Sequence, residues 1–257
     1  MKAKFTNEVY ASIQADLLRS GYSIVKGVVP NVRVDDLRAY GFSLLNQRLE
    51  EGIVWDPFIG ERNKVCYSDD HFQCMYRGYA FPWNVDEGRA NFEIFDQLNS
   101  IRLNLARRVS GNLSMEIHEI YTAWTYYPPK KGRLEKHQDG ICSNPILLHY
   151  IIPLTFKGID FTGGGLYLTD RQGNVVDVDS HLEKGDILFF DGNCAHEVKL
   201  IESSVGVGRM QAFAIPTAFK YPEVSERFLG NLPITTIAKI KFIKFLLSTK
   251  QYIFGKK

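Results

Sequence analysis

The sequence predicts a mainly β fold of the α+β class, with helices gathered in the N-terminal part. Two observations carry this prediction. Up to about residue 113 apolar residues recur mostly at helical spacing, whereas from Ser114 onward the chain breaks into short runs rich in β-branched and aromatic residues. Gly, Pro, Asn and Asp separate these runs at close intervals, which is typical of a β-sandwich or barrel and not of alternating strand and helix units.

The N-terminal part contains three stretches with helical periodicity. These are residues 8–19, 34–51 and 92–111. Asn7 is a suitable N-cap for the first, and Gly21 and Gly111 supply C-terminal stops for the first and third. The run from Tyr22 to Val29 reads as a strand that Pro30 closes.

Seven runs in the second part have the composition of strands. They cover residues 115–127, 144–156, 164–170, 174–180, 185–192, 197–203 and 209–216. The three glycines Gly163–Gly165 precede no helix and no lysine, so a bulge or tight turn is expected there and not a phosphate-binding loop. Because no linker or internal repeat interrupts the chain, we expect one folding unit over residues 1–257.

This unit is expected to have three regions. They are a helix-rich part over residues 1–113, a β-rich core over residues 114–218 and a helical tail over residues 219–257. Within the first region, residues 54–84 are long, aromatic and without periodicity. Such a segment forms either a lid over a site or a packed structural insertion.

Composition narrows the class of function. The 257 residues carry a formal net charge of +2, which gives no reason to expect nucleic acid as a partner. The four cysteines form no CxxC pair, which argues against a zinc knuckle and a disulfide framework. The first residues lack the pattern of a secretory signal, and no uncharged run approaches membrane-spanning length. We expect a cytoplasmic protein.

Three side chains in the second part have the types that bind a transition metal. His137 and Asp139 lie two residues apart, so in an extended backbone they project from the same side. His196 follows a predicted strand nearly sixty residues later, and a fold with two packed sheets can bring it to the other two. Two imidazoles and one carboxylate on one face of an octahedral metal leave three positions open, as in non-haem Fe(II) oxygenases. A lone His-x-Asp pair is more often a surface or capping pair.

An arginine strengthens the metal interpretation. Arg209 opens the apolar run RMQAFAIP thirteen residues after His196. A guanidinium there is costly unless an anion meets it, and that anion is either a ligand or a protein carboxylate.

The order of these motifs resembles a known superfamily. KHQDG, FTGGGLYLTD, HLEKGDILFFDGNCAHEV and GRMQAFAIP follow one another as in the Fe(II)/2-oxoglutarate-dependent dioxygenases, in particular the prolyl-4-hydroxylase-like and phytanoyl-CoA-hydroxylase-like branches. The resemblance covers roughly residues 114–218. It implies a double-stranded β-helix core, related to jelly rolls and cupins, with the N-terminal helices packed on it.

The resemblance also implies site residues and cofactors. His137, Asp139 and His196 would bind Fe(II), and Arg209 would bind the distal carboxylate of 2-oxoglutarate. Tyr127, in a Tyr-Pro pair before the first histidine, would hydrogen-bond this co-substrate, or else be a core tyrosine. In NPILLHYIIPLT a second anchor is either His149 or Tyr150. Dioxygen is the second co-substrate, and ascorbate is a further candidate cofactor.

The same resemblance narrows the reaction. Related halogenases replace the carboxylate ligand by Gly or Ala, whereas this chain keeps Asp139, so hydroxylation of a small molecule or biosynthetic intermediate is expected, with release of succinate and CO2. One alternative is a prolyl-type hydroxylase of peptides or proteins. Another, of a different class, is a non-catalytic cupin-like protein in which the three side chains hold zinc or nothing.

The tail mixes apolar residues and lysines in ITTIAKIKFIKFLLSTKQYIFGKK. The lysines do not gather on one helical face, which favours a helix packed in the core or between subunits. The alternative is a weak peripheral contact with an anionic lipid surface. A truncation before Ile234 tests it, because loss of sedimentation with liposomes is expected only for the lipid contact.

Overall fold

The computed structural model describes residues 5–46, 49–51, 65–80, 89–113, 118–139 and 146–217. All of them belong to one compact unit, Met1–Lys220. The tail over residues 219–257 lies outside the described residues, as do residues 54–64 and 81–84 of the segment predicted as a lid or insertion. Within the described part of the chain, no helix is long and apolar enough to cross a membrane.

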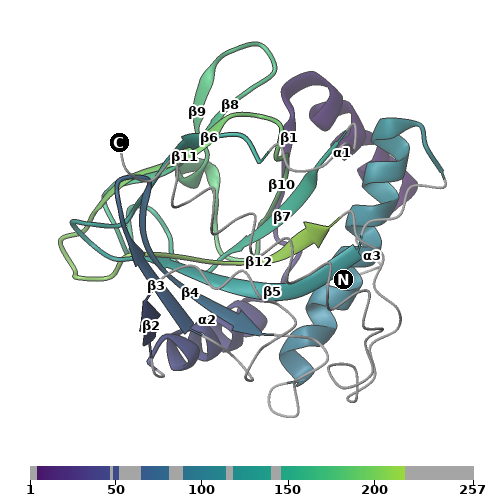
Figure 1. Cartoon of the computed structure of the whole chain (residues 1–257). Helices are drawn as coiled ribbons and strands as arrows, with labels where there is room; N and C mark the ends of the chain where they lie inside the picture. The colour runs from purple at the N-terminus through teal and green to yellow at the C-terminus, as the bar shows by residue number, and fades with distance from the viewer. Residues whose placement is uncertain are drawn as a thin grey trace, which may run out of the picture. The chain divides into compact units, whose positions relative to one another are not determined.

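Twelve strands form one curled sheet, antiparallel except where β2 meets β3 (Figure 1). Their spatial order is β1-β10-β7-β12-β5-β4-β6-β11-β8-β9. In addition, β3 pairs with β4, and β2 pairs with β3. The strands are β1 (Tyr22–Val25), β2 (Leu49–Glu51), β3 (Val65–Asp69), β4 (Gln73–Ala80), β5 (His118–Tyr127), β6 (Arg133–His137), β7 (Leu148–Pro153), β8 (Gly163–Thr169), β9 (Val175–Asp177), β10 (Ile187–Asp191), β11 (His196–Glu202) and β12 (Arg209–Thr217).

The curled sheet has two wings, and β6 joins them because it pairs with both β4 and β11. The larger wing consists of β1, β10, β7, β12, β5 and β4 in this spatial order, and the smaller wing consists of β6, β11, β8 and β9. The predicted mainly β class and the double-stranded β-helix core are confirmed. A short 3-10 helix, η3 (Asp179–His181), follows β9.

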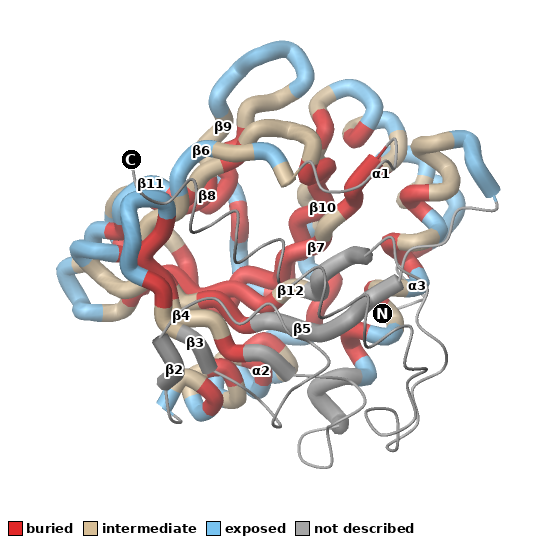
Figure 2. Tube along the Cα trace, viewed as in Figure 1, coloured by how far each residue is buried: buried red, intermediate tan, exposed pale blue. Residues whose placement is uncertain are grey.

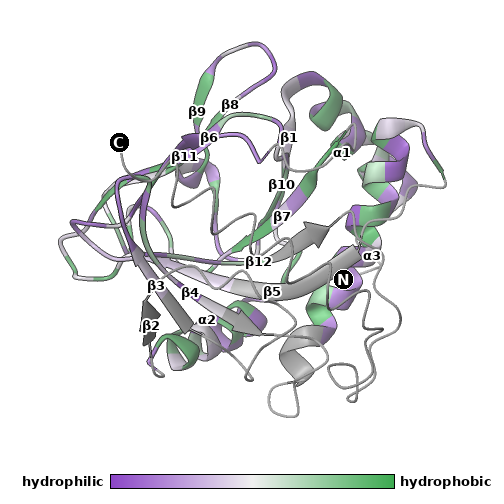
Figure 3. Ribbon diagram, viewed as in Figure 1, coloured by the Kyte–Doolittle hydropathy of each residue, from purple (hydrophilic) through white to green (hydrophobic). Residues whose placement is uncertain are grey.

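Two predicted helices are present almost as expected. Helix α1 (Asn7–Ser20) begins one residue early because Thr6, and not Asn7, is the N-cap, and it ends at Gly21 with φ 81°. Helix α3 (Arg89–Ser110) ends at Gly111, which has φ 69°. Apolar and polar residues alternate around α3 (Figure 3), as expected for a helix with one buried face.

The prediction for the second helix was wrong at its C-terminal end. Helix α2 (Asn31–Leu45) stops at Asn46, and Leu49–Glu51 pair with Val65–Tyr67 as strand β2. Leu49 fits the helical spacing, but in the structure it pairs with Val65 of β3. Helical periodicity alone does not show that competing partner.

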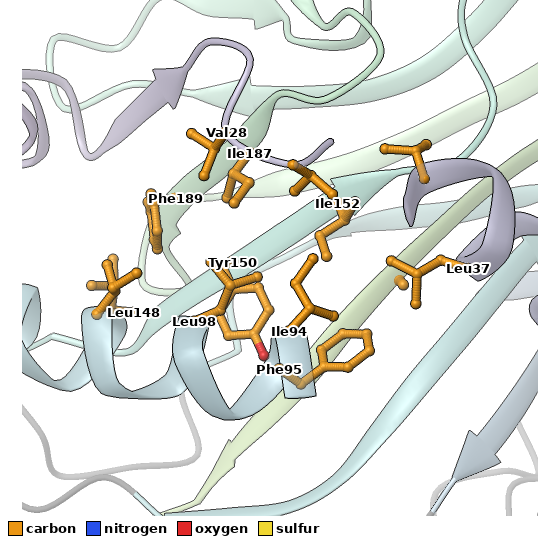
Figure 4. Close-up of a cluster of buried hydrophobic side chains, with 14 of the residues drawn as sticks. Val28, Leu37, Ile94, Phe95, Leu98, Leu148, Tyr150, Ile152, Ile187 and Phe189 are labelled. Carbon is orange, nitrogen blue, oxygen red and sulfur yellow. The ribbon is translucent and has the colours of Figure 1, made fainter. Parts of the chain in front are cut away.

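Buried side chains form two cores on opposite faces of the larger wing. Strands β7 and β10 between these cores consist largely of buried residues (Figure 2). In the outer core α2 and α3 cover the sheet, as Figure 4 shows for Leu37, Phe95, Leu98 and Tyr150. The inner core lies between the two wings. It contains Met75, Tyr127, Ile151, Phe161, Leu166, Leu168, Val178, Leu182, Leu188, Phe190, Val198 and Ile201.

The seven strand-like runs of the second part all contain a strand, and Gly163–Gly165 form the predicted irregularity. Gly164 and Gly165 have φ 72° and 103°, and the register of β8 against β11 shifts beside them. Strands β3, β4 and β6 were missed. Strands β3 and β4 lie in the segment predicted as a lid or insertion, where residues 65–80 form a hairpin that pairs with β5 of the sheet.

Candidate metal centre

Register brings the two histidines together. His137 is the last residue of β6 and His196 the first of β11, and the two are direct partners in the antiparallel pair. Side chains of directly opposed residues project to the same side of a sheet. Their ring centroids accordingly lie 4.2 Å apart.

Asp139 completes the cluster. It lies two residues beyond His137, and its Oδ1 is 3.5 Å from His137 Nε2 while its Oδ2 is 3.6 Å from His196 Nε2. One donor atom from each of the three residues lies within 4.8 Å of the others. The structure therefore brings together the trio that the sequence predicted.

The backbone fixes which ring nitrogens face each other. His137 Nδ1 lies 2.8 Å from the Glu135 carbonyl oxygen, and His196 Nδ1 lies 3.0 Å from that of Cys194. A carbonyl oxygen only accepts, so each Nδ1 carries the proton and donates it. Each Nε2 therefore presents a lone pair toward Asp139, the arrangement that metal-binding histidines have.

Burial and the close carboxylate set the charges of the trio. Burial lowers the pKa of His196 to about 4, so this imidazole is neutral at pH 7. Burial also lowers the pKa of His137, but contacts with Asp139 and the Glu135 carbonyl outweigh it and the net shift is upward. Burial raises the pKa of Asp139, yet the neighbouring imidazoles of His137 and His149 outweigh it, so the carboxylate stays ionised.

A turn between β10 and β11 holds the segment around Asp139. The Asp139 N–H donates to the Gly192 carbonyl at 2.9 Å, and Gln138 Nε2 donates to the Asn193 carbonyl at 2.9 Å. The Asp191 carboxylate accepts from the Leu147 N–H at the start of β7. The turn thus ties the ends of β6 and β7 to β10.

Gly192 has no room for a side chain. A Cβ there would lie 2.7 Å from both Asp139 Oδ2 and His149 Nε2. Sequence reasoning missed this residue, although the Asp-Gly pair before His196 is a turn signal that places it.

Arg209 lies deeper between the wings and is buried. Its Nε and Nη2 donate to the two carboxylate oxygens of Asp179, at 2.6 and 3.1 Å, and its Nη1 donates to Gln211 Oε1 at 2.6 Å. The sequence left open whether a ligand or a protein carboxylate meets Arg209, and in the structure the carboxylate of Asp179 does so. These bonds use three of the five guanidinium N–H groups, so two remain on the terminal nitrogens within the described residues.

Tyr127 lies on the inner face beside Arg209. The two residues are direct partners of β5 and β12, and the Arg209 Cζ is 5.6 Å from the Tyr127 ring centroid. Burial raises the pKa of the Tyr127 hydroxyl, which therefore stays a hydrogen-bond donor at neutral pH.

The structure separates His149 from Tyr150. Tyr150 packs in the outer core, stacked with Phe95 and beside Phe189. His149 Nε2 lies 2.9 Å from Asp139 Oδ2 on the inner side. Of the two alternatives, His149 is the one beside the metal trio.

Phe72 is a further site residue that sequence reasoning missed. It lies in the β3–β4 turn, where its carbonyl accepts from the Glu135 N–H, and its ring meets that of His137 edge-on at 5.4 Å. Phe72 is 37% exposed. Phe72 therefore lies beside the trio, in contact with the His137 ring.

The donor set fits an octahedral divalent metal such as Fe(II). Cis ligands of an octahedral ion with bonds of about 2.1 Å lie about 3 Å apart, and the donor atoms of the trio lie within 4.8 Å of one another, so they would move closer together around an ion. The trio contributes no thiolate, and its two imidazoles and one carboxylate form the set associated with non-haem Fe(II) oxygenases.

Several solved structures have folds similar to that of this chain. A Pseudomonas putida prolyl-4-hydroxylase has 18% identity and a TM-score of 0.56, with 82% of this chain and 100% of that chain covered. SnoN, a non-haem α-ketoglutarate-dependent epimerase from nogalamycin biosynthesis, has 16% identity and a TM-score of 0.57, with 90% and 92% covered. SnoN has also been solved with Fe3+ and α-ketoglutarate.

A third similar structure is a 2OG-Fe(II) oxygenase-family oxidoreductase from Burkholderia pseudomallei, with 14% identity, a TM-score of 0.50, and 81% and 89% covered. No protein-family model matches the sequence, and no curated protein sequence is significantly similar to it. Over most of its length, the chain therefore has the fold of the Fe(II)/2-oxoglutarate oxygenases, with His137, Asp139 and His196 at its candidate metal site.

Proposed function

We propose that this protein is an Fe(II)/2-oxoglutarate-dependent hydroxylase of a small molecule or biosynthetic intermediate. The observation that carries the proposal is the trio of His137, Asp139 and His196, in which both Nδ1 protons are donated to backbone carbonyls and both Nε2 lone pairs face the carboxylate. When bound, iron and 2-oxoglutarate supply the oxidative chemistry: a C–H bond, 2-oxoglutarate and O2 become an alcohol, succinate and CO2.

The protein's own part is to hold these groups and exclude water. His137, Asp139 and His196 would hold the metal, and three protein ligands would leave room on it for the co-substrate and O2. Arg209 presents its remaining N–H groups, and Tyr127 its hydroxyl, to the distal carboxylate of the co-substrate. Phe190 and the other apolar residues of the inner core keep this region dry.

The similar structures point to two candidate classes of substrate. SnoN, similar over nine-tenths of both chains, acts in the biosynthesis of a small molecule by its description, which favours a metabolite. The prolyl hydroxylases of Pseudomonas putida and Trichoplax adhaerens are similar as well, so a peptide or protein substrate is the second candidate. Screening peptides against metabolites for succinate release separates the two.

Anaerobic titration with Fe(II) and 2-oxoglutarate tests the proposal. We expect a weak visible charge-transfer band in the wild-type protein and none in His137→Ala or Asp139→Ala, because each variant loses a ligand. His181→Ala is the matched control, since His181 is exposed on η3, and it should keep the band. A wild-type protein without the band would instead support the non-catalytic, cupin-like alternative.

A further inference from the structure

A third imidazole, His149, lies beside the trio but differs from its two histidines. It belongs to β7, where Ile151 on the same face of the strand is part of the inner core. Its ring stacks on Phe190, with centroids 4.9 Å apart and an interplanar angle of 17°. This stacking restricts rotation of the ring.

The edge of the His149 ring faces Asp139. His149 Nε2 lies 2.9 Å from Asp139 Oδ2, closer than either histidine of the trio comes to that carboxylate. The Nε2 atom is buried, and in this orientation it has no aligned hydrogen-bond partner among the described residues. Gly192 leaves the space in which the two side chains meet, since a Cβ there would lie 2.7 Å from both atoms.

The proton of His149 must be on the nitrogen that faces Asp139. A lone pair held 2.9 Å from an ionised carboxylate oxygen is repelled, whereas an N–H at this distance donates to it with a slight turn of the ring. His137 and His196 have the opposite tautomer, because their Nδ1 atoms meet backbone carbonyls. His137 and His196 therefore each present a lone pair that can bind a metal, whereas His149 presents an N–H donor.

We infer that His149 is a positioning residue, which holds Asp139 Oδ2 by an N–H···O bond so that Asp139 binds the metal through Oδ1 alone. The inference rests on the proposed function. A carboxylate that bound through both oxygens would occupy one of the three positions that the co-substrate and O2 need. A hydrogen bond to the second oxygen prevents this and orients the first, which is the role of outer partners in metal sites.

This role differs from that of a co-substrate anchor, and metal binding distinguishes the two. The test compares His149→Phe, which keeps a ring for stacking on Phe190 but loses the donor, with His149→Gln, which keeps an N–H donor. Mn(II) affinity is measured without 2-oxoglutarate, from the electron paramagnetic resonance signal of free Mn(II). We expect His149→Phe to weaken Mn(II) binding at least about tenfold and His149→Gln to restore most of the loss.

The control variant is His181→Gln, on the exposed 3-10 helix η3, which should bind Mn(II) as the wild type does. Far-ultraviolet circular dichroism and thermal unfolding show whether each variant is folded. If folded His149→Phe binds Mn(II) like the wild type, or His149→Gln is as weak as His149→Phe, the positioning role is overturned. A wild-type protein that binds no Mn(II) would contradict the proposed function itself, and so the two failures are distinguishable.

Discussion

The ion pair between Arg209 and Asp179 shows how single residues shape the interior. Both side chains are buried, and Asp179 Oδ2 also accepts the Leu166 N–H at 2.7 Å. A buried guanidinium needs such a partner, because transferring an unpaired charge out of water costs several kcal/mol. Asp179 thereby holds the guanidinium by one edge and orients its remaining N–H groups.

Breaking this pair should destabilise the protein strongly, in a way that depends on both residues. We expect Arg209→Met and Asp179→Asn each to lower the free energy of unfolding by about 3–5 kcal/mol, because each leaves a buried charge without its partner. The double variant should cost clearly less than the sum. Urea unfolding measures all four proteins.

The exposed pair of Lys184 and Asp35, 2.6 Å apart, is the control. The double-mutant cycle of Lys184→Met, Asp35→Asn and the double variant should give a coupling energy of at most about 1 kcal/mol. If the losses in the free energy of unfolding of Arg209→Met and Asp179→Asn simply add in the double variant, the two residues do not act as a pair.

At the residue scale, the sequence could predict the metal trio and Arg209 but not every residue that contacts them. His137, Asp139 and His196 carry a distinctive chemical pattern, and Arg209 is unusual in an apolar strand. Asp179 lies thirty positions from Arg209 in the 3-10 helix η3, and nothing in its local sequence distinguishes it from a capping residue. Only strand register and the curl of the sheet bring the two together.

At the scale of elements, the turn from Asp191 to Asn193 organises the site. It connects β10 to β11 and holds the ends of β6 and β7 through backbone and side-chain hydrogen bonds. Because its glycine has no side chain, the turn also leaves the space in which Asp139 and His149 meet.

Gly192→Ala should therefore weaken both metal binding and stability. The added methyl group would push Asp139 and His149 aside, and we expect Mn(II) affinity to fall at least about tenfold, with an overpacking cost of about 1–3 kcal/mol in the free energy of unfolding. Calorimetric Mn(II) titration and urea unfolding measure the two effects.

Gly173→Ala is the matched control, since a Cβ at Gly173, whose φ is +88°, meets nothing within 4 Å. This variant should lose stability through backbone strain and keep its Mn(II) affinity. Equal Mn(II) affinity in Gly192→Ala and the wild type would contradict the organising role of the turn.

The elements that the sequence predicted are those with a plain period or clear stop signals. Helices α1 and α3 have an apolar face and a glycine stop, and the later strands lie between turn residues. Strand β4 was missed because Gln73, Cys74 and Met75 are all buried, so its apolar residues do not alternate. Strand β6 is short and charged, with Glu135 and Lys136 exposed.

At the scale of the whole molecule, the described chain is a curled sheet whose two wings enclose the inner core. The metal trio comes from the end of β6, the residues after it and the start of β11, and His149 comes from the larger wing. The fold class was predictable because it depends on the pattern of many short strands. The role of the tail over residues 219–257 stays a prediction, as does the single domain.

X-ray absorption at the iron edge tests the central claim most directly. In the Fe(II)-loaded wild-type protein, before 2-oxoglutarate is added, we expect one six-coordinate ion per chain, bound by two imidazole nitrogens at about 2.1 Å and by oxygens from a carboxylate and water. His196→Ala should lose one imidazole or the ion altogether. A first shell without imidazole, or one that contains thiolate sulfur, would contradict the assignment of His137, Asp139 and His196 as the iron ligands.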